Sequence, residues 1–484
     1  MSGFDELKDY ADYALRVAES EGAEFCEVRC QDDQVEGIII KNGALEGIKA
    51  GRRRGVGIRV LYRGGLGFSS TNVITRESLK TAVVRALKLA MIAGAHRKRN
   101  IVFSREEAPV DSDVIRPKLS MESMPVDERI SFLSEVDKMI LSKEAELKGK
   151  VPWRVFRLEG SITEKFIINT NGAELYSYVP RTYLEAILTT FEGPKGYEQV
   201  IIELGESRGF EVLKEWRIME RMEREVETLV KILREAESPP KGKLDVVLGP
   251  QVVGIAVHES VGHPYEADRI LGREAAQAGE SFVTMEMLGT RIGSGCANVV
   301  DDPTIPHSFG YYKYDDEGVR ARKRYLIKEG MINEFLHNRE TAYIFGVSSN
   351  AAARAVSYDR EPIIRMANTY VEPGDYSFEE LLEDVKLGVY IKTFGEWNID
   401  DRRFNQRYVG KEAYLIEKGE LTKLVSAPIL EITTPKLWSS VDAVGKEELL
   451  EFCAALCGKG DPEQLCPVWM GGPPIRLRKV VLGG

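Results

Sequence analysis

The chain has 484 residues, of which 43% are hydrophobic and 29% are charged, a composition typical of a folded globular protein. Its length predicts about two to four domains. The net charge of −10 argues against a general nucleic-acid binder, which normally carries a basic surface, so we expect no nucleic-acid partner.

The cellular location is predicted from the N-terminus and the apolar runs. The segment MSGFDELKDYADYAL is acidic and amphipathic, without the basic start and apolar core of a secretory signal. The longest apolar stretch, 246–257, is interrupted by Gly249, Pro250 and Gln251 and is too short to span a membrane. We therefore expect a cytoplasmic protein with no membrane partner, whose six cysteines are thiols or metal ligands rather than a disulfide framework.

The first half of the chain has the pattern of an α+β domain. Apolar residues at helical spacing predict helices over 5–20, 76–93 and 126–144. Segments with β character, separated by turn residues, lie at 25–31, 36–41, 55–62, 66–70, 151–158, 164–169, 174–185 and 196–203. Because their connections are short, most of these strands should pair in antiparallel fashion.

A long charged helix, predicted over 211–237, ends this half. The segment Ser238-Pro239-Pro240-Lys241-Gly242-Lys243 follows, and two prolines and a glycine among polar residues are typical of a linker. The predicted organisation is an N-terminal α+β domain over 1–237, a linker over 238–243 and a C-terminal domain over 244–484, with mainly antiparallel sheets.

The second half begins with an apolar strand at 244–248. Pro250 follows at once and suits the first turn of a helix that leads into His258. Further helices are predicted near 378–387 and 448–456, among strands with Gly, Asn and Asp turns.

The helix after Pro250 carries the most informative stretch of the chain, His258-Glu259-Ser260-Val261-Gly262-His263. It holds two of only five histidines, and a glutamate follows the first of them. Neutral imidazole is a common zinc ligand, and a glutamate beside a metal-activated water can act as its general base. The pattern therefore indicates a metallohydrolase with Glu259 as the catalytic residue.

The spacing of these histidines differs from that of ordinary zinc proteases, where they stand at i and i+4 on one helical face. At i and i+5 on a regular α-helix they would lie about 140° apart and could not share a metal comfortably. A π-type bulge or a helix end between them would bring them together, and Gly262 and Pro264 favour such a break. The alternative is a helix end that bears two unrelated polar histidines.

A third ligand would strengthen the metal interpretation. Cys457 stands out, because glycines follow it and Lys459 lowers the cost of a thiolate; we expect it at the end of the helix predicted over 448–456. Cys453, on the same helix face, fits a buried small thiol better. The other candidates are Glu266, Asp268, His307, His337 and Cys466.

Ordered sequence blocks extend the motif over nearly the whole chain. They are GAEFCEVR and GVGIRVL in the first half, and HESVGHPYEAD, YDDEG, LIKEGMINEFL, RMANT, EAYLIEKGEL and CGKG in the second. In these blocks the chain resembles the TldD/PmbA family, specifically its metal-binding TldD branch. The departures are Ala267 in place of a usual glycine, Pro264 after the second histidine, and DPEQLCP in place of a glutamine-rich stretch.

This resemblance implies zinc held by His258, His263 and Cys457, with Glu259 in catalysis. The PmbA branch lacks these residues. Family members cleave peptides and unfolded segments, and they form dimers, often with the metal-free PmbA-like sister. We therefore expect a zinc-dependent peptidase, with a peptide or unfolded protein as substrate and either a homodimer or a heterodimer as the assembly.

Two other functions stay open. A non-haem iron enzyme would bind its metal through His258, His263 and a carboxylate such as Glu266 or Asp268. The same carboxylates could instead hydrogen-bond the histidines of a zinc site. A non-catalytic adaptor or modulator would act by binding a partner protein and would not depend on Glu259.

Other polar residues in these blocks have open roles. Arg365 could stabilise an oxyanion, although a structural salt bridge is at least as good an interpretation. Asp315, Asp316 and Glu317 could bind a cation, but a solvated turn or local pairing fits them better.

Overall fold

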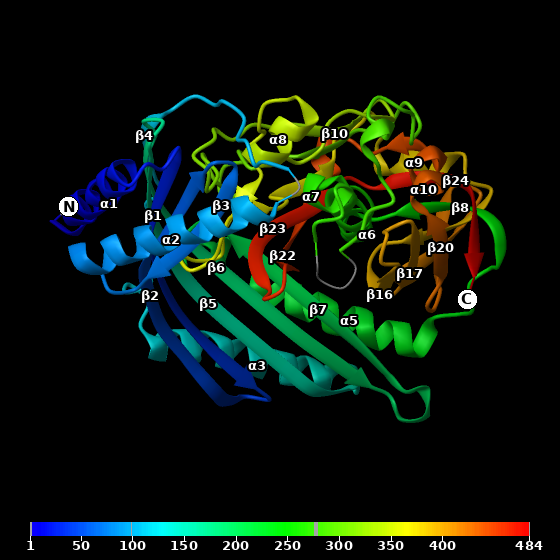
Figure 1. Ribbon diagram of the computed structural model, residues 1–484. Helices are drawn as coiled ribbons and strands as arrows, with labels where there is room; N and C mark the ends of the chain where they lie inside the picture. Colours follow the sequence, from blue (N-terminus) through cyan, green and yellow to red (C-terminus); the bar gives the residue numbers. More distant parts are fainter. Residues whose placement is uncertain (1, 98, 275–278, 484) are drawn as a thin grey trace.

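A computed structural model describes residues 2–97, 99–274 and 279–483 of the chain. Its N-terminal half is a twisted sheet of long strands with helices along it, and its C-terminal half builds two further sheets around a short buried helix (Figure 1). The α+β class and the predominance of antiparallel pairing are as predicted. Within the described residues, no helix is long and apolar enough to cross a membrane.

The N-terminal sheet has the strand order β3-β2-β1-β5-β6-β4, with β7 also paired to β6. Its strands are β1 (Phe25–Lys41), β2 (Ala44–Tyr62), β3 (Gly65–Thr71), β4 (Val110–Val114), β5 (Lys150–Asn169), β6 (Glu174–Phe191) and β7 (Tyr197–Glu206). Among these neighbours only β4 and β6 run parallel.

The prediction of separate strands at 25–31 and 36–41 was wrong, because β1 continues through the polar residues 32–34. This run has the composition of a turn, yet it pairs with Arg52–Arg54 of β2, and Asp32 accepts a hydrogen bond from Nε of Arg52 at 2.9 Å. Cross-strand charge pairing thus keeps the backbone extended where local preference favours a turn. β5 likewise joins two predicted strands.

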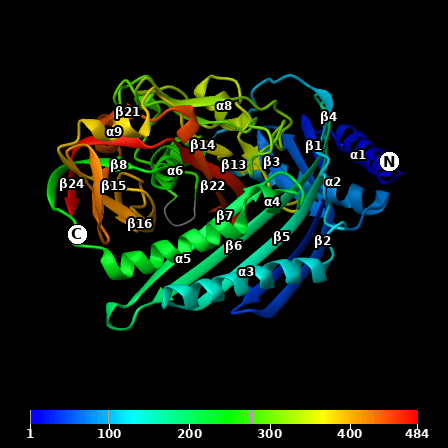
Figure 2. The same cartoon turned by 180° about the vertical axis from the view of Figure 1, so that it is seen from behind.

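Helices cover one face of this sheet, and Figure 2 shows two of them, α3 and α5, running along the strands. Even-numbered side chains of β1, such as Val28 and Ile38, pack into the helix-covered cores. The helical segments of this half are α1 (Ser2–Ser20), α2 (Arg76–His96), α3 (Val126–Leu147), η1 (Gly193–Lys195), α4 (Val212–Glu215) and α5 (Ile218–Glu235). The helix predicted over 211–237 is divided, because Arg217 has a left-handed backbone (φ 49°).

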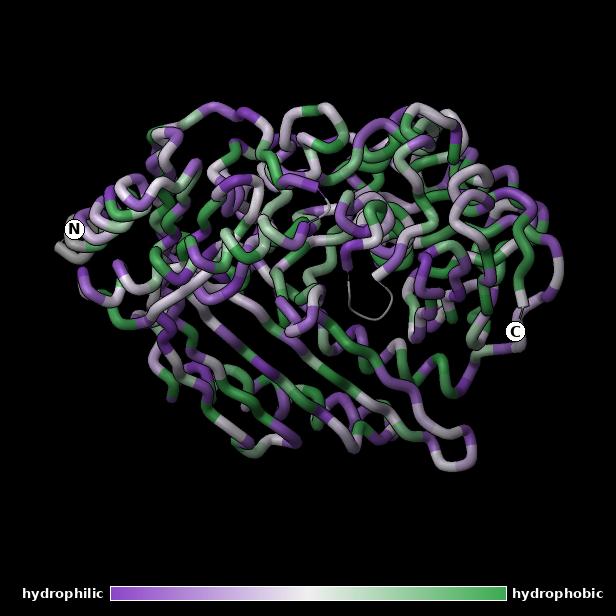
Figure 3. Tube along the Cα trace, in the orientation of Figure 1, coloured by the Kyte–Doolittle hydropathy of each residue, from purple (hydrophilic) through white to green (hydrophobic). Residues whose placement is uncertain are grey.

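The C-terminal half packs against the opposite face of the sheet. Glu27, Arg29 and Arg59 point that way and are buried although they are charged. Arg59 pairs with Glu27 at 3.0 Å and with Glu317 of the C-terminal half at 2.7 Å. The long strands therefore alternate apolar and polar residues (Figure 3). The predicted domain boundary at residues 238–243 stays a prediction.

Two large sheets form the C-terminal half. One has the order β16-β17-β20-β24-β8-β15-β18-β19, with β21 paired to β24, and the other has the order β11-β10-β9-β14-β23-β22; β12 and β13 pair separately. The strands are β8 (Gly242–Leu248), β9 (Val299–Asp301), β10 (Arg324–Lys328), β11 (Met331–Ile332), β12 (Ala353–Arg354), β13 (Ile363–Ile364), β14 (Asn368–Val371), β15 (Leu387–Ile391), β16 (Phe394–Ile399), β17 (Asn405–Gly410), β18 (Ala413–Glu417), β19 (Glu420–Leu424), β20 (Ile429–Thr433), β21 (Val441–Val444), β22 (Glu451–Lys459), β23 (Gln464–Gly472) and β24 (Ile475–Gly483).

Helix α6 (Pro250–Val257) lies in the core between these sheets and leads into the histidine motif. It is buried from Val252 onward, and a helix that is apolar on all sides belongs in a protein interior. The other helical segments of this half are η2 (His258–Gly262), η3 (His263–Tyr265), α7 (Ala267–Ile270), η4 (Met285–Met287), α8 (Arg339–Phe345), α9 (Phe378–Glu383), α10 (Thr434–Ser440) and η5 (Glu447–Leu449).

The helix predicted over 448–456 was wrong, because most of this segment is strand β22. Its sequence, rich in Glu, Leu and Ala, has a high helix propensity. Pairing with β23 over the whole strand, from Glu451↔Gly472 to Lys459↔Gln464, outweighs that preference. Cys457 therefore lies in a strand and not at the end of a helix.

Candidate metal centre

The helix after Pro250 changes its winding at the histidine motif. α6 ends at Val257, η2 is a π-helical turn over His258–Gly262, and η3 is a 3-10 turn that begins at His263. The i, i+5 spacing left open a π-type bulge or a helix end, and the structure has the π-type turn. Gly262 permits close packing here, since a Cβ at this position would lie 1.8 Å from Sδ of Met366.

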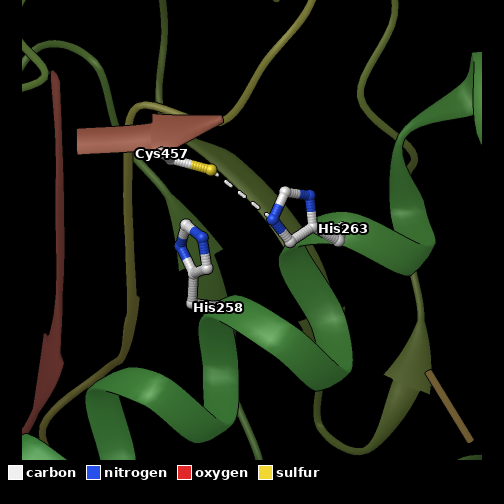
Figure 4. Close-up of side chains that lie close together, drawn as sticks. All are labelled: His258, His263 and Cys457. Carbon is white, nitrogen blue, oxygen red and sulfur yellow. Dashed lines mark hydrogen bonds between the residues drawn. The ribbon is translucent and has the colours of Figure 1, made fainter. Parts of the chain in front are cut away.

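The π-turn places His258 and His263 next to each other, and both face Cys457 of β22 (Figure 4). The centroids of the two imidazole rings are 4.8 Å apart. One ligand atom from each of the three residues lies within 4.8 Å of the others, and Sγ of Cys457 is 3.5 Å from Nε2 of His263. All three side chains are buried, so the structure brings the three predicted ligands into one group.

The donor atoms of the three residues fit a metal ion. Nδ1 of His258 is buried without a hydrogen-bond partner among the described residues. Burial, helped by the nearby Arg403, lowers the pKa of His258 to about 3, so this imidazole is neutral. Burial acts to raise the pKa of the Cys457 thiol, but His263 and Arg365 outweigh it and lower that pKa to about 6. Imidazole nitrogens with a thiolate are a donor set that suits zinc.

Glu266 holds the other ring nitrogen of His263. Its Oε2 lies 3.1 Å from Nδ1 of His263 and accepts a hydrogen bond from Nε of Arg269 at 2.6 Å. Nζ of Lys459 lies 3.3 Å from the same oxygen and 2.8 Å from Asp268. Burial acts to raise the pKa of Glu266, but Lys459, Arg269 and His263 hold it well below its usual value. The carboxylates of Glu266 and Asp268 are thus paired with cationic side chains, and Glu266 is also the hydrogen-bond partner of His263.

Glu259 is buried beside the metal group and forms an ion pair with Arg403. Arg403 lies between β16 and β17, and burial lowers its pKa to about 10. The sequence contains no signal for this arginine, because it stands 144 residues from Glu259 in a charged loop without a motif.

Arg365 is engaged with the main chain. Its guanidinium donates to the carbonyl groups of Cys457 and Gln464 and so ties β22 to β23 beside the metal group. Burial raises the pKa of the Cys457 thiol, and the charge of Arg365 acts with His263 to lower it. Arg365 forms no salt bridge among the described residues, and its role toward an oxyanion stays a prediction.

Asp315, Asp316 and Glu317 are buried, and each has a hydrogen-bond or ion-pair partner. Asp315 accepts the main-chain N–H of Glu317 at 3.0 Å, Asp316 binds Nζ of Lys165 at 2.7 Å, and Glu317 binds Arg59. Only Asp315 is paired locally, and the predicted solvated turn was wrong, because the N-terminal sheet covers the turn and supplies the partners of Asp316 and Glu317.

The other candidate ligands lie apart from this group in the described part of the chain. His307 is exposed, and His337 is buried with its ring centroid 4.9 Å from that of Phe345. Cys466 is buried in β23, where it pairs with Cys457 of β22. Burial raises the pKa of Cys453 to about 12, as expected of a thiol that packs in a core.

Sequence profiles of one family match three parts of the chain. The PmbA/TldA metallopeptidase C-terminal domain matches residues 241–484, and domain 1 and the central domain of that family match 26–90 and 120–237. The chain belongs to the PmbA/TldD metallopeptidase family. The resemblance inferred from the ordered blocks is therefore confirmed, and the His-His-Cys group indicates the TldD branch.

Several relatives of the chain carry the same activity in their names. A metalloprotease of Methanocaldococcus jannaschii is 31% identical over 471 residues, which cover 97% of this chain and 96% of that protein. A zinc metalloprotease of Saccharolobus solfataricus, a TldD homolog, is 26% identical over 97% of this chain and 99% of its own length. The predicted metalloprotease class is thus confirmed over the full length.

Solved structures share the fold at low sequence identity. A Thermotoga maritima protein has a TM-score of 0.76 at 18% identity and covers 99% of this chain and 100% of its own. TldE from Thermococcus kodakarensis has a TM-score of 0.73 at 18% identity over 98% of this chain and 100% of its own.

Proposed function

We propose that the chain is a zinc-dependent peptidase for short or unfolded peptides, with His258, His263 and Cys457 as the zinc ligands and Glu259 as the general base. The convergence of the two histidines with Cys457 in one buried group, which includes an unpartnered imidazole nitrogen, carries this proposal. The similarity to the zinc metalloprotease of Saccharolobus solfataricus supports the choice of metal.

The protein residues divide the work of hydrolysis between them. Bound zinc would supply Lewis acidity, which polarises the scissile carbonyl and makes a water acidic at neutral pH. Glu259 takes a proton from the attacking water and passes it to the leaving amine. Glu266 accepts from Nδ1 of His263, which directs Nε2 toward Cys457 and fixes the tautomer that a ligand needs.

Strand β22 offers an extended peptide a binding edge next to the metal group. It ends the described six-stranded sheet, and Cys457 is one of its residues. In an antiparallel pair every second residue turns its N–H and C=O away from the neighbour, so the outer edge of β22 presents backbone groups for pairing. A peptide added there would be held by its own backbone, which favours unfolded substrates of varied sequence.

The assembly is proposed as a dimer, either of two copies or with a metal-free sister of the PmbA type. TldE from Thermococcus kodakarensis shares the fold of this chain. A sister subunit of the same architecture is therefore a candidate partner.

Incubation of the purified protein with a mixture of unstructured peptides tests the proposed function. We expect cleavage that a chelator abolishes and added zinc restores. Glu259→Gln keeps the size of the side chain but cannot take a proton, so cleavage should fall about 100-fold or more at unchanged zinc content.

Two outcomes would favour the other functions. Cleavage by Glu259→Gln at the rate of the unchanged protein would refute the general base, and no cleavage by any form would favour an adaptor. Recovery of the chelated protein with ferrous iron but not with zinc would favour an iron enzyme.

A further inference from the structure

The loop between β16 and β17 brings a buried arginine to the catalytic glutamate. Asp400 orders this loop by accepting the main-chain N–H groups of Phe404 and Asn405 at 2.8 and 3.0 Å. Arg403 donates its own N–H to the carbonyl of Asp400 at 2.9 Å, and its carbonyl accepts from Oγ1 of Thr434 at 2.8 Å. The backbone is therefore fixed on both sides of Arg403.

The backbone of Arg403 is itself unusual. Its φ of 62° lies in the left-handed region, which a residue with a Cβ rarely adopts. Such residues persist where surrounding contacts hold them, and they cluster at functional sites. The effect here is to turn the Arg403 side chain inward, where 9% of it is exposed, whereas 62% of the neighbouring Arg402 side chain is exposed.

The guanidinium meets one carboxylate, that of Glu259, in the described part of the chain. Nη1 of Arg403 pairs with Oε2 of Glu259, and Nε of Arg403 is buried without a partner among these residues. The pair lies beside the metal group, because Glu259 directly follows His258 in the π-turn η2 and both side chains are buried.

We propose that Arg403 is the positioning residue of Glu259. Its guanidinium holds Oε2 and leaves Oε1 free to take the proton of the attacking water. This proposal rests on the proposed role of Glu259 as general base. An arginine suits the task because its guanidinium is rigid, planar and always charged, whereas a lysine supplies a point charge on a flexible chain.

Steady-state kinetics on a peptide whose cleavage is chelator-sensitive tests this role. Arg403→Met should lower kcat about 100-fold and change KM by less than about threefold, because the base is misplaced while the peptide-binding edge is intact. Arg403→Lys should recover part of the loss. The matched control is Arg402→Met, which alters the exposed neighbour and should retain kcat within about twofold.

Two further measurements separate positioning from a merely structural ion pair. Zinc content and the visible spectrum of the cobalt-substituted protein should be the same in Arg403→Met and the unchanged protein. In a Glu259→Gln background, Arg403→Met should cause no further loss of kcat, because the two side chains act as a unit.

The results that would contradict the positioning role of Arg403 differ from those that would contradict the proposed function. Full kcat in Arg403→Met, a loss that multiplies with that of Glu259→Gln, or a loss explained by missing zinc would overturn the positioning role. If Arg403→Met does not fold, the same comparisons apply to Arg403→Lys. An unchanged protein without chelator-sensitive cleavage would instead refute the proposed function.

Discussion

Cys457 is the residue on which the metal group depends most, because it comes from a different element than the two histidines. His258 and His263 share one turn and stay together through local backbone geometry. Cys457 reaches them from β22, and the charges of His263 and Arg365 lower the pKa of its thiol although burial raises it, which favours the thiolate. A thiolate is the form that binds a metal, so the site is prepared for one.

Removal of this thiol should therefore empty the site. We expect Cys457→Ala to retain well under half of the zinc of the unchanged protein, measured by elemental analysis after dialysis, and to lose peptide cleavage. Cys453→Ala is the matched control, since Cys453 lies in the same strand but outside the metal group, and it should retain full zinc. Equal zinc in both variants would exclude Cys457 as a ligand.

The sequence reaches some residues of the site and not others, for a physical reason. Glu259 and the two histidines form one local string, and Cys457 is marked by its glycine neighbours and by the family blocks. Arg403 has no such mark, because its role depends on a loop that folds back onto η2. Residues marked by local spacing or by a family block were predictable, whereas Arg403, which only a tertiary contact brings to the site, was not.

At the scale of elements, the π-turn η2 brings the imidazoles of His258 and His263 together. Nε1 of Trp438 donates to Oγ of Ser260 at 3.0 Å, and that hydroxyl in turn donates to the carbonyl of Ala256. A break in the regular helix was predictable, because the i, i+5 spacing requires one and Gly262 permits it, but its π form was one of two alternatives. The strand β22 was not, because its pairing with β23 overrides a helix-forming sequence.

A side chain at position 262 should damage the turn. In Gly262→Ala the new Cβ would overlap Sδ of Met366, which is itself 1% exposed and has little room to move. We expect a loss of about 1–3 kcal/mol in the free energy of unfolding, measured with urea, together with weaker zinc binding as His263 shifts. Gly295→Ala, where a Cβ meets nothing within 4 Å, should be neutral. Equal stability of the two variants would contradict this packing.

At the scale of the whole molecule, the two halves are joined by buried charges. Arg59 of β2 bridges Glu27 of β1 and Glu317 of the C-terminal half, and Lys165 of β5 binds Asp316. Since Arg59, Glu27 and Lys165 belong to strands of the N-terminal sheet, their ion pairs hold the C-terminal half against that sheet. Sequence alone could not predict this contact between the halves, because alternating charged residues in a strand normally indicate a face exposed to solvent.

Loss of one partner in this network should destabilise the molecule as a whole. Glu317→Ala leaves Arg59 with one carboxylate and removes the acceptor of the Arg339 N–H, so we expect a loss of about 3–5 kcal/mol in urea unfolding. Lys49→Ala breaks the exposed pair with Glu159, where the lysine side chain is 61% exposed, and should cost less than about 1 kcal/mol. Similar losses in both would mean that the junction contributes little.

The distance along the chain between His263 and Cys457, 194 residues, has a consequence for biosynthesis. At a synthesis rate of about 5–20 residues per second, the ribosome makes the histidine turn roughly 10–40 s before the cysteine. During that interval the nascent polypeptide carries two of the three proposed ligands and lacks both β22 and its partner β23. The three-residue metal group is thus completed late in translation, and a chain that stalls before β22 lacks the third of its proposed ligands.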